Sequence, residues 1–327
     1  SVQEMASLTM KGFDLADKYL MTSMILADGT IGQMMEPISF EDAEVEHYEK
    51  PWALTGTQCK RKHNVVNSLY LKPDELEKKN FERYGEEFPL LVKYLDCNDK
   101  LSVQVHPNDE LALERHDSFG KTEAWYVVDC KPGAAIYLGF KDLTITREEY
   151  IAAVAESRLE SLLNKVEVHP GDVFFIPAGT VHALGKGIEV LEIQQTSDVT
   201  YRIYDWNRVD DKGNPRELHT ALAVDAIDFA SEAEECHIRY DEKANQSVKM
   251  VDCPYFTTNI IALEGEKEFD YASLDSFVLY ICTAGEADVT VGGVTEHITP
   301  YELVMIPAEA DAVSLKGDAK LLEVYIK

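Results

Sequence analysis

Short apolar runs dominate the chain from about residue 88 onward. They are rich in β-branched and aromatic residues and are bounded by Gly, Pro, Asn or Asp, which is the pattern of strands separated by tight turns. Many short strands in succession predict an all-β sandwich or barrel. We expect these strands at 89–96, 101–106, 123–129, 134–140, 172–178 and 189–195.

Three segments have the periodicity of helices instead. Residues 146–165 place apolar positions at helical spacing behind a Thr and early Glu residues, and residues 217–230 form a shorter candidate. Residues 72–88 also have a helical pattern with a solvated face, but residues 1–85 contain no motif that carries chemistry. The fold class is therefore expected to be mainly β, with helical insertions.

An internal repeat organises the second half of the chain. The segment VHPGDVFFIPA at 168–178 resembles ITPYELVMIPA at 298–308, and the second copy has Ala312 where the first has His182. Two copies of one β-unit predict two related β-domains, of which the second has lost the function of His182. We expect a divergent N-terminal region that packs on the catalytic domain, a metal-binding domain and a degenerate C-terminal domain. Their predicted bounds are 1–85, 86–240 and 241–327.

Composition narrows the class of protein. The 327 residues are 45% hydrophobic and 28% charged, which is ordinary for a globular chain with a sizeable core. The net charge of −28, from 31 Lys+Arg and 59 Asp+Glu, argues against partners such as nucleic acid or an anionic membrane surface. Residues 210–327 hold 24 of the acidic and 9 of the basic side chains. Much of the acidity therefore lies away from the candidate chemistry below, and it does not exclude an anionic small substrate.

Cysteine usage and the N-terminus indicate a cytoplasmic protein. The six Cys residues include no C-x-x-C pair, and we expect them to be reduced and mostly buried. No apolar run approaches the roughly 20 residues that span a bilayer. The first residues also lack the basic and apolar regions of a secretory signal.

Three motifs carry candidate metal ligands. Gln104 and His106, in LSVQVHPND, lie two apart on an expected strand and so face the same side. Glu123 follows Lys121 in GKTEAWYVV, and His182 follows a Pro-Ala-Gly turn in IPAGTVHALGKG, a layout typical of a jelly-roll metal ligand. Each residue alone also fits a solvated or structural role. Together, two imidazoles, a carboxylate and an amide oxygen suit Zn²⁺, with Fe²⁺, Mn²⁺ or Co²⁺ as alternatives.

These motifs, together with EIQQTSDVTYRIYDWNR, resemble the type I mannose-6-phosphate isomerases of the bacterial cupin form over residues 86–220. The resemblance implies a cupin jelly roll, one Zn²⁺ per chain, and interconversion of mannose 6-phosphate and fructose 6-phosphate. The Trp-Gly-Gly and Gly-Glu-Ser-Trp motifs of that family are absent from residues 1–85. Because this region normally helps to wall the site, the sugar-phosphate specificity stays open.

The resemblance also assigns roles to individual residues. The zinc ligands that it implies are Gln104, His106, Glu123 and His182. It implies an active-site arginine at Arg202, proton transfer or substrate contact at Lys121 and Glu192, and phosphate contacts at Ser102 and Lys93.

Aldose–ketose isomerisation through an enediol(ate) needs a base near C1 and C2, charge stabilisation and a grip on the phosphate. The metal and Arg202 suit charge stabilisation, whereas the sequence does not rank Lys121 against Glu192 as the base. Glu192 could equally be a structural partner, and Arg202 could form an ion pair with Asp198 or Asp205.

The competing functions are a non-catalytic cupin that binds a sugar or sugar phosphate, an isomerase of another sugar phosphate, and an Fe²⁺ cupin oxygenase. The oligomeric state and the role of the C-terminal domain also stay open.

Overall fold

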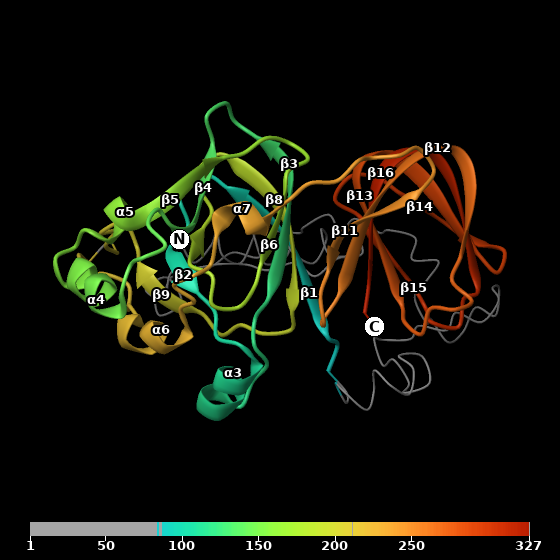
Figure 1. Cartoon of the computed structure of the whole chain (residues 1–327). Coiled ribbons are helices and arrows are strands. Elements are labelled where there is room, and N and C mark those ends of the chain that lie inside the picture. The colour runs from blue at the N-terminus through green and yellow to red at the C-terminus, as the bar shows by residue number, and fades with distance from the viewer. Residues whose placement is uncertain (1–83, 85–86, 211, 327) are drawn as a thin grey trace, which may run out of the picture. The chain divides into compact units, whose positions relative to one another are not determined.

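The computed structural model describes residues 84, 87–210 and 212–326. The predicted N-terminal region at 1–85 and the predicted helix at 72–88 lie outside these residues, apart from Tyr84 and residues 87–88. All six predicted strands are present, and the chain is mainly β (Figure 1).

The first β-domain is built from two antiparallel sheets of five strands each. Sheet I has the order β1 (Leu90–Cys97), β8 (Ile188–Gln195), β3 (Glu123–Cys130), β6 (Val173–Ile176) and β10 (His237–Ile238). Sheet II has the order β5 (Leu163–Glu167), β4 (Ala135–Phe140), β7 (His182–Ala183), β2 (Val103–Val105) and β9 (Tyr201–Tyr204). Neighbours along the chain are mostly not neighbours in a sheet, which is the topology of a jelly-roll sandwich.

Sheet I is covered on both faces, which explains why its strands are nearly continuous apolar runs. Trp125 and Val190 pack toward sheet II in one apolar core. Ala124 and Leu191, the next residues along β3 and β8, pack in a different core that includes residues of the C-terminal domain. Alternation along each strand therefore separates the two cores.

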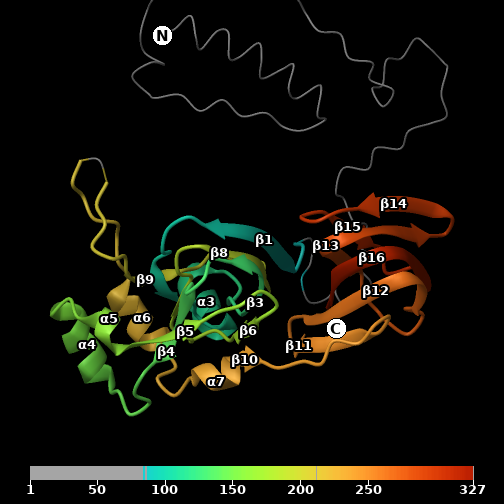
Figure 2. The same cartoon turned by 90° about the horizontal axis from the view of Figure 1, so that it is seen from above.

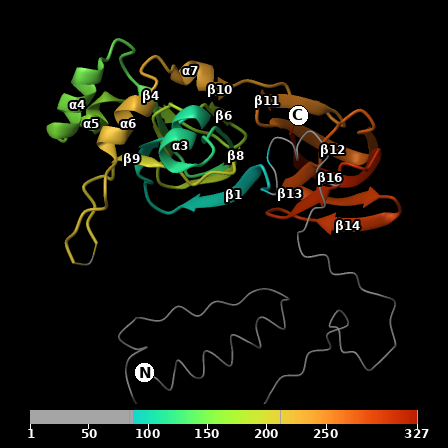
Figure 3. The ribbon, with the colours of Figure 1, turned by 90° about the horizontal axis from the view of Figure 1, so that it is seen from below.

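Helices cover the outer face of sheet II, where Tyr150 of α4 and Ala223 of α6 pack against Val103 and Tyr201. Figure 2 shows these helices gathered on one side of the sheets. A further helix, α3, lies at one end of the two sheets (Figures 1 and 3). In the part of the chain that the structure describes, the labelled helices are α3 (Asp109–His116), α4 (Arg147–Ala155), α5 (Leu159–Leu162), α6 (Thr220–Ala226) and α7 (Ala233–Cys236).

The helix predicted at 146–165 is too long. It begins as expected, with Thr146 and Glu149 forming a capping box at the start of α4. The chain then leaves the helix at Ser157, whose φ is 55°, and after the short α5 it enters β5 at Leu163. Of the leucines at the end of the segment, Leu159 and Leu162 lie in α5 and Leu163 is buried in sheet II, and spacing alone did not distinguish them from one helix face.

The C-terminal domain is a sheet of longer strands, in the order β11 (Ser247–Asp252), β12 (Thr257–Asp270), β16 (Ala312–Tyr325), β13 (Val278–Val291) and β14 (Val294–Ile298). A sixth strand, β15 (Leu303–Ile306), also pairs with β13. Leu322 and Val324 on one face of β16 share a core with sheet I, whereas Leu321 faces a core of the C-terminal domain's own.

The repeated segments fold alike. In the first copy the N–H of His169 donates to Asp172 Oδ2 at 2.7 Å, and in the second the N–H of Thr299 donates to Glu302 Oε2 at 2.7 Å. The residue before each acid has a left-handed backbone: Gly171 at φ 90° in the first copy. In the second copy that position is a non-glycine residue, Tyr301, at φ 75°. The shared turn leads into β6 and β15, which pair with β3 and β13 respectively.

Candidate metal centre and active site

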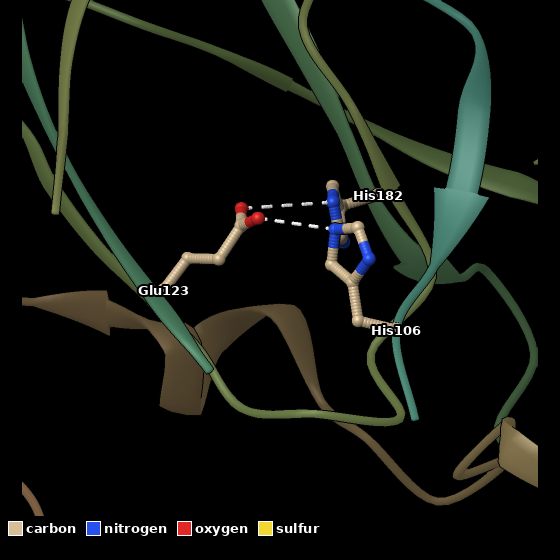
Figure 4. Close-up of side chains that lie close together, drawn as sticks. All are labelled: His106, Glu123 and His182. Carbon is tan, nitrogen blue, oxygen red and sulfur yellow. Dashed lines mark ion pairs between the residues drawn. The ribbon is translucent and has the colours of Figure 1, made fainter. Parts of the chain in front are cut away.

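Three buried side chains converge between the two sheets (Figure 4). His106 follows β2, Glu123 is the first residue of β3, and His182 is the first residue of β7. Glu123 Oε1 lies 3.0 Å from His106 Nε2, and Glu123 Oε2 lies 3.8 Å from His182 Nε2. One ligand atom from each residue lies within 4.8 Å of the others, and all three side chains are at most 1% exposed. In the described part of the chain, this is the His/Cys/Asp/Glu group that is close enough to hold a metal.

Gln104 completes the predicted set through strand register. It pairs with His182 across β2 and β7, and its amide nitrogen lies 3.2 Å from His182 Nε2 and 3.5 Å from His106 Nε2. Turning the amide by 180° exchanges its nitrogen and oxygen, so either atom can face the two imidazoles. The structure therefore brings all four sequence-predicted ligands together.

The surroundings of the two histidines fit a divalent metal. His106 Nδ1 lies 2.9 Å from the carbonyl oxygen of Val199, and His182 Nδ1 lies 2.9 Å from that of Thr180. A carbonyl oxygen can only accept, so each Nδ1 carries the proton and each Nε2 keeps its lone pair. Burial lowers the pKa of His106 to about 4, against the attraction of Glu123, and burial also lowers the pKa of His182. Both rings are therefore neutral at neutral pH, as metal ligands must be.

Glu123 gives the second sign that the site fits a metal. Burial opposes its ionisation, but the nearby His106 and Lys121 outweigh this and hold the pKa of Glu123 well below its usual range. Its Oε1 atom lies 3.0 Å from both Lys121 Nζ and His106 Nε2 but has no hydrogen bond of good geometry. The unprotonated Nε2 atoms of the two histidines face this ionised carboxylate, an arrangement that is unfavourable unless a further cation lies between them. This donor set suits a divalent transition metal.

The two candidate bases lie on either side of Glu123. Lys121 is buried, with its Nζ atom 3.0 Å from Glu123 Oε1. Glu192 lies on β8 and is also buried. Its pKa is raised by burial and by the negative charge of Glu123, against the effects of Lys121 and Lys93.

A tryptophan that the sequence interpretation missed connects the two carboxylates. Trp125 Nε1 lies 3.0 Å from Glu192 Oε2 and 3.1 Å from Glu123 Oε2, so one N–H serves both acceptors. Trp125 is two residues after Glu123 and opposite Glu192 in the β3–β8 ladder. The spacing of two along one strand was the available signal, because it places Trp125 on the same face as the ligand.

The two residues predicted to contact the phosphate, Lys93 and Ser102, contact different side chains. Lys93, on β1, pairs with Glu192 in register and its Nζ donates to Glu192 Oε1 at 3.0 Å and to Gln194. Ser102 instead contacts Arg202, whose Nε donates to the Ser102 hydroxyl at 3.4 Å. Lys93 thus lies beside a candidate base, and Ser102 beside the predicted arginine.

Arg202 reaches the site because it pairs with Gln104 across β2 and β9. Its Nη1 atom donates to the carbonyl oxygen of Glu217 at 2.8 Å. The buried Asp205, a suggested partner of Arg202, forms its ion pairs with Arg208 and, at 3.7 Å, with Arg216. Burial and these two neighbouring guanidinium groups lower the pKa of Arg202. Sequence reasoning missed both neighbours, because their position depends on the fold of the chain after β9.

A jelly roll with a buried His-Glu-His group between its sheets defines the chain as a cupin of the metal-binding kind. Two family models match it: "Phosphomannose isomerase type I, catalytic domain" over residues 37–140, and "Mannose-6-phosphate isomerase, cupin domain" over residues 246–326. The chain belongs to the type I mannose-6-phosphate isomerase family and is an isomerase of that class.

Individual relatives agree with the family models. The chain is 36% identical over 247 residues to mannose-6-phosphate isomerase ManA of Bacillus subtilis, which covers 74% of this chain and 76% of the relative. It is 35% identical over 264 residues to the mannose-6-phosphate isomerase of Streptococcus mutans, which covers 79% and 82%. The crystal structure of mannose 6-phosphate isomerase from Bacillus subtilis matches with a TM-score of 0.68 at 34% identity, covering 74% of this chain and 76% of that chain.

A second similarity involves a different enzyme. The chain is 50% identical over 98 residues to ketoisovalerate oxidoreductase subunit VorB of Methanothermobacter marburgensis, which covers 29% of this chain and 28% of that protein. In the described residues, no helix is both long and apolar enough to span a membrane.

Proposed function

We propose that this chain interconverts mannose 6-phosphate and fructose 6-phosphate, with one zinc ion bound between its two sheets. The observation that supports the proposal is the gathering of the four predicted ligands with Lys121 and Glu192 between the sheets, and Arg202 lies in register with the ligand Gln104 on the neighbouring strand. A cupin that only binds sugar needs no buried base beside its metal. The predicted domain bounds and cytoplasmic location belong to this proposal and await tests of their own.

Gln104, His106, Glu123 and His182 would hold the zinc. When bound, the metal supplies positive charge that favours an oxygen anion on the substrate. Two neutral imidazoles, one carboxylate and one amide leave a dication with a net positive charge, and the donor set does not exclude Mn²⁺, Co²⁺ or Fe²⁺.

Glu192 and Lys121 are the candidate groups for moving the proton between C2 and C1. The raised pKa of Glu192 brings this carboxylate closer to neutral pH, where a base both exists in its ionised form and binds a proton well. Lys121 Nζ forms an ion pair with Glu123 Oε1 at 3.0 Å, so this group already lies against an anion. The geometry therefore favours Glu192 as the base and Lys121 as a cation that contacts the substrate oxygens.

The substrate phosphate is proposed to bind beside Ser102. Arg202 contacts that hydroxyl, and Arg208 and Arg216 lie close enough to affect the pKa of Arg202. Two guanidinium groups pair with one carboxylate, Asp205, and a third, that of Arg202, pairs with no carboxylate in the described part of the chain, which leaves positive charge for a phosphate dianion. Lys93 stays a predicted second contact, with its ammonium group now bound to Glu192.

A coupled assay tests the reaction. The zinc-loaded protein is incubated with mannose 6-phosphate, and fructose 6-phosphate formation is followed. We expect turnover that disappears on chelation and returns with Zn²⁺. Product from another sugar phosphate alone would keep the chemistry and change the substrate. Binding without turnover on any sugar phosphate tested would favour the non-catalytic cupin, and oxygen consumption with bound iron would favour the oxygenase.

Metal analysis tests the ligand set. We expect His182→Ala to lose both bound metal and activity, because it removes one of the four ligands. His297→Ala is the matched control, since His297 is an exposed histidine that pairs with Asp288 in the C-terminal domain. Stoichiometric metal and full turnover in His182→Ala would refute the assignment.

Arg202→Ala separates catalysis from metal binding. We expect it to keep its zinc and to lose turnover by roughly 10²- to 10³-fold, the range seen when one group that stabilises an oxyanion is removed. Arg158→Ala, which removes an exposed arginine that pairs with Glu156, serves as the control. Normal turnover in Arg202→Ala would rule out the role.

A further inference from the structure

The carboxylate of Asp109 accepts three hydrogen bonds at the edge of the candidate metal centre. Its Oδ1 atom accepts from the N–H of Gly120 at 2.8 Å and from Gln195 Nε2 at 2.9 Å. Its Oδ2 atom accepts from the hydroxyl of Tyr255 at 2.8 Å. Asp109 opens helix α3, only three residues after the ligand His106, at the end of the sheets seen in Figure 3. One carboxylate thus joins three separate parts of the chain.

The first of these parts is the segment that ends in the ligand Glu123. A Cβ atom on Gly120 would lie 2.5 Å from the backbone nitrogen of Asp109 and 2.6 Å from the carbonyl carbon of Asn108, so only glycine allows this approach. The N–H of Lys121 donates to the carbonyl oxygen of Pro107 at 3.1 Å. The segment therefore lies directly against the residues that follow His106.

The second part is the end of β8. Gln195 donates to Asp109, and its Oε1 atom accepts from the N–H of Thr122 at 2.8 Å. The backbone N–H groups of three successive residues, 120 to 122, therefore all donate hydrogen bonds. The N–H groups of residues 120 and 122 donate to Asp109 and Gln195, which are hydrogen-bonded to each other. These residues immediately precede Glu123, so their hydrogen bonds determine where Lys121 and Glu123 are placed.

The third part comes from the C-terminal domain. Tyr255 lies in the loop between β11 and β12, 146 residues away from Asp109 in sequence. We propose that Tyr255 is a positioning residue of the isomerase site, which holds Asp109 and through it the segment carrying Lys121 and Glu123. The inference rests on the proposed function and gives the C-terminal domain a part in it.

The physical reason is that a carboxylate with one bound oxygen can rotate. Asp109 is only partly buried, and Oδ1 alone serves the active-site segment. A hydrogen bond from a tyrosine hydroxyl to an ionised carboxylate is of the stronger, charge-assisted kind, and it fixes the second oxygen. Without it, Asp109 can turn toward water and release Gly120 and Gln195.

The test compares Tyr255→Phe with Tyr240→Phe. Both tyrosines are partly buried against the core shared by the two domains, and each hydroxyl donates a hydrogen bond of 2.8 Å. Tyr240, however, donates to the carbonyl oxygen of Gly171, away from the metal centre. Amide hydrogen exchange of the peptide holding residues 120–123 is measured in the full-length protein, with and without zinc, beside kcat and KM.

We expect exchange at residues 120–123 to accelerate about tenfold in Tyr255→Phe and to be unchanged in Tyr240→Phe. We expect kcat to fall about tenfold in the first variant, with KM within twofold of wild type. Asp109→Ala should do the same, and adding Tyr255→Phe to it should have no further effect. Equal exchange in the two tyrosine variants, or effects that multiply in the double variant, would overturn the proposal. A wild-type protein without isomerase activity would refute the proposed function, and the exchange data would still decide the role of Tyr255.

Discussion

Trp125 and Glu192 face each other across β3 and β8, and the indole nitrogen of Trp125 lies 3.0 Å from Glu192 Oε2 and 3.1 Å from Oε2 of the candidate metal ligand Glu123. A single donor thus holds the candidate base and a ligand at a fixed separation. The side chain is 1% exposed, so water cannot replace the donor.

Trp125→Phe should therefore slow turnover. Phenylalanine keeps most of the apolar volume but donates no hydrogen bond, which leaves two buried carboxylates without their shared partner. We expect kcat to fall by roughly 10- to 100-fold, with metal retained, since groups that orient metal ligands typically have effects of that size. Steady-state kinetics and metal analysis measure this. A variant with wild-type kcat would show that Glu192 and Glu123 need no such support.

The acidic limb of the pH–rate profile should reflect the ionisation of Glu192. A general base must be ionised, so activity is lost as the pH falls through its pKa. Burial and Glu123 raise that pKa, which places the limb above the range of an ordinary carboxylate. Because Lys93 opposes this rise, Lys93→Met should move the limb to still higher pH.

This profile also decides the role of Lys93. If the role of Lys93 is to lower the pKa of Glu192, Lys93→Met shifts the acidic limb of the pH–rate profile to higher pH. It then leaves the KM for mannose 6-phosphate nearly unchanged. If Lys93 instead binds the phosphate, KM rises and the limb stays in place. Lys131→Met, a substitution away from the metal centre, is the control for removing one positive charge.

The metal-free protein should become less stable below pH 6.5. The unfolded chain binds a proton on His106 near pH 6.5, whereas the folded protein does so only near pH 4. The unfolded state therefore holds more protons between these values, and stability falls as the pH is lowered through them. The folded-state value of about 4 corresponds to a loss of about 3 kcal/mol in the free energy of unfolding from this residue.

Denaturant unfolding of the chelated protein at several pH values tests this dependence. We expect His106→Asn to have a shallower decline than the wild type, because asparagine does not titrate. His169→Asn, at a histidine whose side chain is 72% exposed, should follow the wild-type curve. Parallel curves for His106→Asn and the wild type would contradict the expected proton uptake.

Gly120→Ala should destabilise the protein and disturb the metal centre together. The added methyl group would press on the backbone of Asn108 and Asp109, which cannot move aside as a flexible side chain could. We expect a loss of about 1–3 kcal/mol in the free energy of unfolding, the usual range for overpacking, and weaker zinc binding. Gly213→Ala is a comparison for backbone strain alone, because Gly213 has a φ of 83° that disfavours alanine while a Cβ atom there meets nothing within 4 Å. It should leave zinc binding unchanged, and wild-type stability and zinc binding in Gly120→Ala would show that the close approach is not a constraint.

The sequence alone predicted the group of candidate metal ligands and the class of fold. Gln104 and His106 could be placed together because side chains two apart on a strand share a face, whatever the rest of the fold does. Short β-rich runs and a repeated turn predicted two β-domains for the same local reasons. The end of the helix after Ala155 could not be predicted in this way, since the leucines at 159–163 continue the spacing of a helix face although they lie in a second helix and a strand.

Tertiary structure decided the partners of the residues around the metal. Lys93 contacts Glu192 because β1 lies beside β8, and Trp125 reaches the same carboxylate from the other neighbouring strand. Tyr255 reaches Asp109 only because apolar faces of the two domains form one core. Such contacts join residues far apart in the chain, and their geometry depends on how sheets pack rather than on local spacing. Sequence thus specified which side chains could bind a metal, and packing specified which groups hold them in place.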